Sequence, residues 1–173
     1  MSVGDAVITL RAPSAADRPR VRESVQATAV FRPDEVAVAL EVFDDAIADP
    51  EADYTALGAF EDSRLVGFSL YGPTPCTLAT WDIYWIVVDP AVQRRGIGRQ
   101  LMFASEEAIR SRGGRLIVIE TSSRPDYGPT RAFYEVLDYT RAAHIADYYA
   151  PGDDLIVYTK HLAPPTTETA HHG

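Results

Sequence analysis

The chain has 173 residues, of which 46% are hydrophobic and 24% charged, as in an ordinary soluble domain with a substantial core. Its 25 acidic against 16 basic residues disfavour a nucleic-acid-binding surface, because neutralising phosphates needs a basic face. The lone Cys76 excludes an internal disulfide and a cysteine-based zinc site, and the scattered histidines do not suggest a metal. Because no apolar stretch has the length of a membrane span and no signal pattern is present, we expect a cytoplasmic protein that binds no metal, membrane or nucleic acid.

The first half of the chain predicts two helices followed by a β-hairpin. Ser14 and Asp17 form a capping-box pattern at the start of a helix over about 14–28. Pro33 suits the first turn of a second helix, whose apolar residues then follow helical spacing. The segments "TALGAFE" and "LVGFSLY" flank "DSR" and predict an antiparallel hairpin over 55–71.

The second half predicts alternating strands and helices. Residues 81–88 ("WDIYWIVV") and 115–121 ("RLIVIET") are apolar on both faces, as expected of buried strands. Between them a helix begins near Ile97 and ends at Gly113 and Gly114. The inward stripe of this helix is predicted to consist of Ile97, Leu101, Ala104, Ala108 and Ile109.

The end of the chain predicts a short helix and two closing strands. The helix covers 130–137, and the strands lie around 140–148 and 155–161, on either side of a "PGDD" turn. This element order defines a mixed-sheet α/β domain over 1–162. The Pro/Thr-rich residues 163–173 are expected to form a disordered tail.

The segment "QRRGIGR", residues 93–99, connects the strand over 81–88 to the next helix. Its two glycines let the backbone approach a ligand closely, and a helix N-terminus offers unpaired N–H groups to an anion. Three arginines here, in an acidic protein, indicate the same kind of ligand; a tight turn that the arginines merely solvate is the alternative. A dinucleotide fingerprint would need a third glycine where Leu101 stands, and the Walker pattern is absent.

Several motifs resemble the Gcn5-related N-acetyltransferase (GNAT) superfamily. Gln-x-x-Gly-x-Gly at 93–98 follows the strand end "VDP", and "AFYEVLDY" stands at 132–139. Together with "YGPTP", "DIYW", "ETSSRPDY" and "DYYAPGDD", they are similar to a bacterial subgroup, over about residues 6–162. The resemblance implies an α/β GNAT fold: a single mixed, mostly antiparallel sheet flanked by helices, whose central parallel strands 81–88 and 115–121 splay apart.

The resemblance also implies that acetyl-CoA is the co-substrate. In the family the backbone amides of the turn bind the pyrophosphate, and the strand before it binds the pantetheine arm, its last amide polarising the thioester carbonyl. Tyr127 stands where many members have a CoA-binding asparagine, and Asp138 stands where they have a glycine. The implied cofactor-binding residues are Ile86, Val87, Val88, Gln93, Arg94, Arg95, Gly96, Ile97, Gly98, Arg99 and Tyr127.

Three side chains are candidates for catalytic proton transfer. The resemblance assigns Tyr134 to protonation of the leaving CoA thiolate, with a structural, half-buried tyrosine as the alternative. Asp82 occupies the strand in which histone-acetylating members carry a glutamate base, and a carboxylate in an apolar strand needs a partner or a use. A structural Asp82, Glu120 of the neighbouring strand as base, and deprotonation by solvent are the alternatives. Strand alternation predicts Asp82, Tyr84 and Ile86 on one face.

The acceptor site is predicted from aromatic residues that lie beside carboxylates, a combination that suits a cationic amine; a solvated hairpin with surface aromatics is the alternative. The candidates are Tyr71, Thr74, Tyr84, Asp147, Tyr148 and Tyr149, with Asp82 and Asp153. We therefore expect an acetyl-CoA-dependent N-acetyltransferase acting on a primary amine of a small metabolite or amino-acid-like acceptor, and the family suggests a homodimer. The alternatives are a protein N-terminus or lysine as acceptor, another acyl group, or a non-catalytic CoA-binding sensor.

Overall fold

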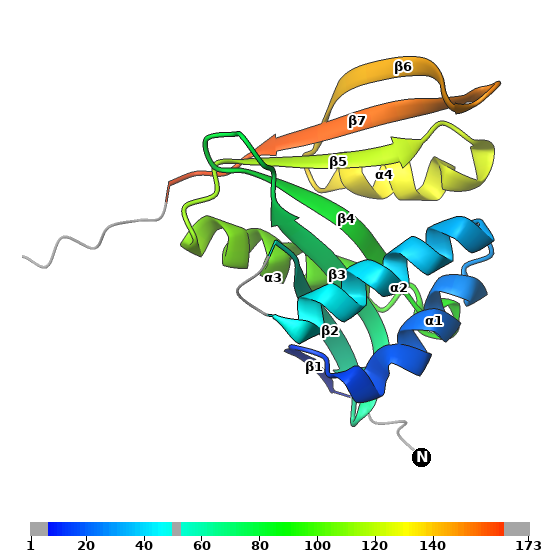
Figure 1. The fold of residues 1–173 in the computed structure, drawn as a ribbon, viewed down its shortest axis with the longest axis vertical. Coiled ribbons are helices and arrows are strands. Elements are labelled where there is room, and N and C mark those ends of the chain that lie inside the picture. The colour runs from blue at the N-terminus through cyan, green and yellow to red at the C-terminus, as the bar shows by residue number, and fades with distance from the viewer. Residues whose placement is uncertain (1–6, 50–52, 165–173) are drawn as a thin grey trace, which may run out of the picture.

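The computed structural model describes residues 7–49 and 53–164, in which one mixed sheet is flanked by helices (Figure 1). The strands are β1 (Ile8–Arg11), β2 (Thr55–Glu61), β3 (Arg64–Pro73), β4 (Thr80–Val88), β5 (Leu116–Ser122), β6 (Thr140–Ala150) and β7 (Asp153–His161). The α-helices are α1 (Arg18–Ala27), α2 (Pro33–Ala48), α3 (Ile97–Ser111) and α4 (Gly128–Val136). The strand order is β1-β2-β3-β4-β5-β7-β6, with β4 and β5 parallel and the other neighbours antiparallel. The predicted GNAT fold is confirmed.

The first two helices begin at the signals read from the sequence. The Ser14 N–H donates to Asp17 Oδ2 at 2.8 Å, which confirms the capping box, although one 3₁₀ turn precedes α1. Helix α2 begins at Pro33, and the Arg32 N–H donates to Glu35 Oε2 at 2.7 Å. Local capping therefore fixes where both helices start.

The ends of the described chain add one element to the prediction. The four-residue strand β1 was not predicted, although Ile8 and Leu10 alternate with polar residues and pack against the core beside α3. Of the tail predicted over 163–173, residues 163–164 have no regular structure and the rest lies outside the described residues. Within 7–49 and 53–164, no helix combines the length and the apolar character of a membrane span.

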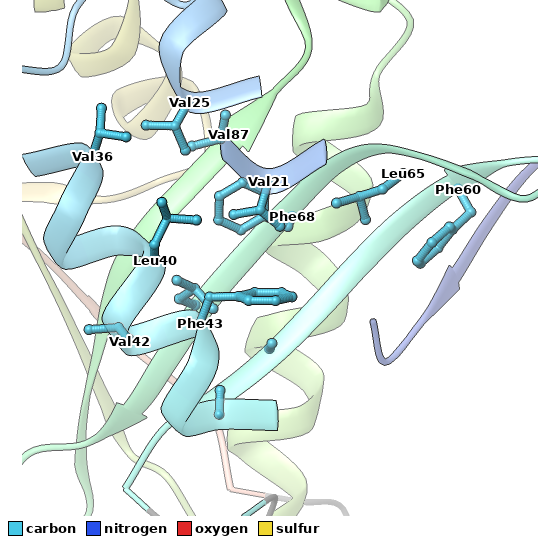
Figure 2. Packing of buried hydrophobic residues seen from close by; sticks show 13 residues of the cluster. Val21, Val25, Val36, Leu40, Val42, Phe43, Phe60, Leu65, Phe68 and Val87 are labelled. Carbon is cyan, nitrogen blue, oxygen red and sulfur yellow. The ribbon is translucent and has the colours of Figure 1, made fainter. Parts of the chain in front are cut away.

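Helices α1 and α2 cover one face of β2–β4 (Figure 1). Figure 2 shows aliphatic side chains of both helices packed over aromatic and aliphatic side chains of the strands. The labelled members of this core are Val21, Val25, Val36, Leu40, Val42, Phe43, Phe60, Leu65, Phe68 and Val87. Phe43 and Phe68 are fully buried, so truncating either to alanine should cost about 3–5 kcal/mol.

Helices α3 and α4 pack on the other face, where the predicted stripe of α3 needs a correction. Ala104 and Ala108 are only partly buried, whereas Met102, Ser105 and Glu106 are buried. The prediction considered apolar residues alone. It therefore left out Ser105 and Glu106, two polar residues whose side chains are buried and form hydrogen bonds.

Glu106 can be buried because two polar groups meet its carboxylate. The Tyr139 hydroxyl donates to Oε1 at 2.9 Å, and the Lys160 ammonium donates to Oε2 at 2.9 Å. A buried charge with these partners avoids the large penalty of an unpaired one.

Strands β4 and β5 pair over a short stretch and then separate. Their ladder joins 80–82 of β4 to 116–118 of β5. Beyond it, within the described residues, β4 pairs with β3 and β5 pairs with β7. The predicted splay of the central parallel strands is therefore confirmed, and it leaves one edge of β4 without a ladder partner.

A β-bulge in β4 changes which side chains share a face. Tyr84 is an extra residue opposite the step from Leu70 to Tyr71 of β3. Ile83 before the bulge and Ile86 after it both belong to the core beside α3. The prediction that Asp82, Tyr84 and Ile86 share one face is therefore wrong for Ile86, because strict alternation does not survive a bulge.

Candidate functional site

The turn that follows β4 is anchored by Asp89. Its carboxylate accepts hydrogen bonds from the Ala91 N–H at 3.0 Å and from Arg20 Nη2 of α1 at 2.7 Å. Its own N–H donates to the Val66 carbonyl at 2.9 Å. Burial favours the neutral carboxyl, but these bonds keep the pKa of Asp89 below its ordinary value. The strand end is thus tied to both α1 and β3.

Helix α3 starts directly after Gly96, whose φ of +74° lies in the left-handed region that favours glycine. No described side chain accepts from the N–H groups of residues 97–99, so these donors of the first helical turn lack a protein partner. A Cβ added at Gly98 would lie 3.4 Å from Phe133 of α4 and 3.6 Å from Val88. The turn therefore offers unpaired donors to an anion, with α4 close beside them.

Two side chains of the turn bond to other parts of the protein, and two arginines carry charges that no carboxylate pairs with among the described residues. Arg95 forms an ion pair with Glu61 at 2.7 Å, and Gln93 donates to the backbone carbonyl at the end of β4 at 3.3 Å. Arg94 and Arg99 are exposed, and neither has a carboxylate partner within 7–49 and 53–164. These two arginines leave positive charge at the uncapped helix start, as the anion-binding prediction requires.

A cavity of about 370 Å³ lies on the α2 side of the splay. It draws on five segments: the start of α2, β4, β5, the connection to α4, and the β6–β7 hairpin. Its lining residues are Phe31, Arg32, Glu35, Asp82, Ile83, Tyr84, Trp85, Val118, Glu120, Thr121, Ser122, Arg124, Tyr127, Tyr149 and Asp153. We call this cavity the carboxylate pocket.

Asp82 and Glu120 lie together in the carboxylate pocket but have different surroundings. Asp82 accepts a hydrogen bond from the Thr74 hydroxyl at 2.5 Å. Glu120 is exposed within the pocket, and its carboxylate has no hydrogen-bond or ion-pair partner among the described residues. The surrounding protein still desolvates its carboxyl, and this desolvation together with the Asp82 charge raises the pKa of Glu120. A raised carboxyl pKa suits a general base, because it strengthens proton affinity toward neutral pH.

Aromatic rings form the walls of the pocket. Burial is the main cause that raises the pKa values of Tyr84, Tyr127 and Tyr149 to about 12, and neighbouring carboxylates add to it. Tyr127 also meets Phe31 edge-on, with 6.2 Å between ring centroids. All three phenols stay neutral at pH 7, so they can offer hydroxyl donors and aromatic faces to a cationic ligand.

Tyr134 of α4 is 5% exposed, and its ring packs 6.1 Å from Tyr139 and 5.7 Å from Tyr158. Burial is the first cause that raises the pKa of Tyr134. Its hydroxyl forms no hydrogen bond with a described residue. The raised pKa keeps the phenol protonated at neutral pH, as a proton donor must be.

Four predicted acceptor residues do not line the pocket. Tyr71 is 3% exposed and lies in the core beside α3. Asp147 accepts from the Gly152 N–H at 2.7 Å and so closes the β6–β7 turn. Tyr148 is 54% exposed, on the outer surface of that hairpin. Thr74 is likewise not a lining residue, since it acts on Asp82.

Several lining residues were not singled out from the sequence. They are Phe31, Arg32, Glu35, Trp85, Ser122 and Arg124. The quoted motif "ETSSRPDY" contained two of them, and the Pro33 signal placed Glu35 in the first turn of α2. Nothing in the sequence, however, brought the start of α2 to the edge of β5.

The site geometry agrees with the comparison with known families. The sequence profile of the acetyltransferase (GNAT) family matches residues 20–139, which include the turn, both splayed strands and α4. The chain belongs to the GNAT family of acetyltransferases. A GNAT-family protein from Desulfovibrio desulfuricans is 38% identical, with a TM-score of 0.87 over 91% of this chain and 100% of that one. No curated protein matches the chain in sequence.

Two more distant solved structures share the fold. The ribosomal-protein-S18-alanine N-acetyltransferase of Escherichia coli has a TM-score of 0.74 at 19% identity, over 94% of this chain and 98% of that one. An aminoglycoside 6'-N-acetyltransferase complexed with coenzyme A has a TM-score of 0.72 at 17% identity, over 91% and 99%.

Proposed function

We propose that this GNAT protein transfers the acetyl group of acetyl-CoA directly to a primary amine of a small metabolite or amino-acid-like acceptor. The observation that carries this proposal is the arrangement around the β4–β5 splay. An uncapped, arginine-flanked helix start lies at the end of β4, and a carboxylate pocket opens beside the same strand. The first suits the phosphates of CoA, and the second suits an amine.

The residues present fit acetyl-CoA. The N–H groups of residues 97–99 and the side chains of Arg94 and Arg99 would hold the pyrophosphate. Alternate backbone groups of β4 beyond Asp82 face an edge with no ladder partner among the described residues, so they can bond the pantetheine amides. Tyr127, in the pocket wall, would lie where the cofactor meets the acceptor. Bound acetyl-CoA supplies a thioester as the acetyl donor. The distant relative solved with coenzyme A supports the same use of the fold.

The ammonium of the acceptor must lose a proton before the amine can attack the thioester. We assign Glu120 as the proton acceptor, because its carboxyl is unbonded and its pKa is raised. Asp82, the first candidate from the sequence, is engaged by Thr74 and would orient the ammonium and keep the Glu120 pKa high.

Tyr134 would donate the second proton. As the amide bond forms and the carbon–sulfur bond breaks, the departing thiolate needs a proton, and a positioned phenol can donate it. The raised pKa of Tyr134 supports this role, because it keeps the phenol protonated at neutral pH until the thiolate forms.

The proposal is tested by incubating the protein with acetyl-CoA and a panel of amines, with thiol release and the mass of the product as readouts. The panel contains mono- and diamines, amino acids, and peptides with a free N-terminus or lysine. We expect thiol release matched by acetylation of a small amine. Acetylation of the peptides alone would overturn the acceptor class, and tight acetyl-CoA binding without any product would favour a CoA-binding sensor.

A further inference from the structure

The charges of the carboxylate pocket are unbalanced. Glu35, Asp82, Glu120 and Asp153 line it, against Arg32 and Arg124, which leaves an excess of two negative charges. A single ammonium would not neutralise this excess. A ligand with more than one positive charge would.

Both arginines of the pocket already contact carboxylates, one of which, Glu35, itself lines the pocket. Arg124 donates to both carboxylate oxygens of Asp126, each at 3.1 Å, and lies over the Tyr127 ring. Arg32 donates to Asp34 at 3.3 Å and lies 3.9 Å from Glu35. Among the described residues, no ion pair joins either guanidinium to Asp82, Glu120 or Asp153.

The pocket carboxylates form two pairs. Asp82 and Glu120 form the inner pair, in the splay. Glu35 of α2 and Asp153 of β7 form the outer pair, at the level of Tyr149 in the lining. Tyr149 lies within electrostatic range of Glu120 and of both outer carboxylates, so its ring links the two pairs.

Asp153 is the member of the outer pair that most needs a cation. It is 6% exposed, and its carboxylate accepts a hydrogen bond from the Ser122 hydroxyl, a neutral donor. Arg124 lies within electrostatic range of Asp153, but no described residue forms an ion pair with this buried carboxylate, so an added ammonium near it and Tyr149 would be favourable.

We propose that the acceptor is a diamine or longer polyamine, whose reacting amine lies at Asp82 and Glu120 and whose second ammonium lies between Glu35, Asp153 and Tyr149. This inference rests on the proposed acetyl transfer to a small amine and narrows its acceptor class. An acceptor with a distal carboxylate is repelled at the outer pair, because carboxylates outnumber arginines among the residues that line the pocket.

Three probes of matched length test the proposal: 1-aminobutane, 1,4-diaminobutane and 4-aminobutanoate, which differ in the group four carbons from the reacting amine. We expect kcat/KM to be roughly tenfold or more higher for the diamine than for the monoamine, as for a close charge pair in a partly desolvated site. The amino acid should be the poorest substrate. The preference for the diamine should shrink with added salt. Equal values for the diamine and monoamine, or a preference for 4-aminobutanoate, would overturn the proposal.

Variants of Glu35 and Asp153 test whether the outer pair causes the preference for the diamine. Glu35→Gln and Asp153→Asn should each lower the diamine-to-monoamine ratio of kcat/KM several-fold, whereas Asp45→Asn, on the exposed face of α2, should preserve it. A ratio unchanged in both pocket variants would contradict the assignment. Glu35→Gln keeps the test valid if Asp153→Asn fails to fold.

Calorimetry separates this inference from the proposed function. If none of the amines is acetylated, the proposed function fails, and binding of the same three probes in the presence of coenzyme A still decides the inference. Tighter binding of the diamine supports a dication pocket. Equal binding, or none, overturns it.

Discussion

The turn before α3 and the carboxylate pocket recognise their ligands with different parts of the chain. The turn uses backbone N–H groups of one contiguous segment, opened by the left-handed Gly96. The pocket uses side chains from five separate segments. The turn is exposed and its donors lack a protein partner, whereas the pocket is lined by rings and by carboxylates, one of which, Asp82, raises the pKa of Glu120.

This difference indicates which of the two sites can change its ligand more easily. A backbone site for phosphates tolerates many side chains as long as the glycines remain, so the same turn can serve many acetyltransferases. A pocket built from distant side chains changes its ligand with one or two substitutions. The acceptor should therefore depend on α2, β5 and the β6–β7 hairpin, and the acetyl donor on the turn.

The largest expected effect concerns Tyr134, which acts where the acetyl donor and the acceptor meet. Tyr134→Phe removes the proton donor and keeps the ring, so kcat should fall by roughly 10²- to 10⁴-fold, with a much smaller change in acetyl-CoA affinity. Steady-state kinetics and calorimetry measure the two quantities. Unchanged turnover in Tyr134→Phe would make the residue structural.

Tyr139→Phe is the matched control for that variant. The Tyr139 hydroxyl lies in the same core and donates to the buried Glu106, so its loss should lower the free energy of unfolding by about 1–3 kcal/mol. Its kcat should stay near that of the wild type.

The next effect concerns only the turn that we propose binds acetyl-CoA. Gly98→Glu places a carboxylate beside the uncapped N–H groups, next to Phe133, and should weaken acetyl-CoA binding roughly 100-fold or more. Gly98→Ala adds one methyl group at contact distance and should change affinity far less. Amine binding, measured separately, should survive in both. Equal acetyl-CoA affinity in Gly98→Glu and the wild type would remove the turn from the phosphate site.

A smaller effect probes the inner carboxylates. Asp82 raises the pKa of Glu120, so Asp82→Asn should lower it and move the acid limb of the kcat/KM–pH profile to lower pH. The sign follows because less negative charge nearby makes the Glu120 carboxylate easier to form. A limb that moves to higher pH, or disappears, would instead make Asp82 the base.

The smallest effect concerns the residue that holds Asp82. Thr74→Val removes the 2.5 Å hydrogen bond and leaves the lining of the pocket intact. We expect kcat/KM to fall only a few-fold, the usual cost of one hydrogen bond, with unchanged acetyl-CoA affinity. Thr74→Ser, which keeps the hydroxyl, should restore the activity, and a Thr74→Ser variant as impaired as Thr74→Val would refute the positioning role.

The sequence predicted the turn well because its signal is local. The glycines, the arginines and the helix start lie within a few residues of one another, and the flanking strands are long apolar runs. The splay of β4 and β5 followed from the family resemblance. The acidic residues Asp82 and Glu120 were found because a carboxylate stands out in an apolar strand.

The remainder of the pocket was missed for physical reasons. Packing of α2 against the sheet, which brings Glu35 and Phe31 to the pocket, depends on tertiary contacts that no local pattern encodes. Tyr71 was assigned to the acceptor site although it is buried in the core beside α3. The bulge at Tyr84 shifts the alternation by one residue, and a period of two cannot reveal it.

The most direct test of the central claim is the pH dependence of kcat/KM for an amine substrate in the wild type and in Glu120→Gln, with the acetyl-CoA dissociation constant measured on both. The wild type should show an acid limb above the ordinary range of a glutamate pKa, because burial and Asp82 raise it. Glu120→Gln should lose that limb and most of its activity while it binds acetyl-CoA as the wild type does. An acid limb that persists in Glu120→Gln, or an acetyl-CoA affinity that falls together with turnover, would contradict the assignment of acceptor activation to the pocket and cofactor binding to the turn.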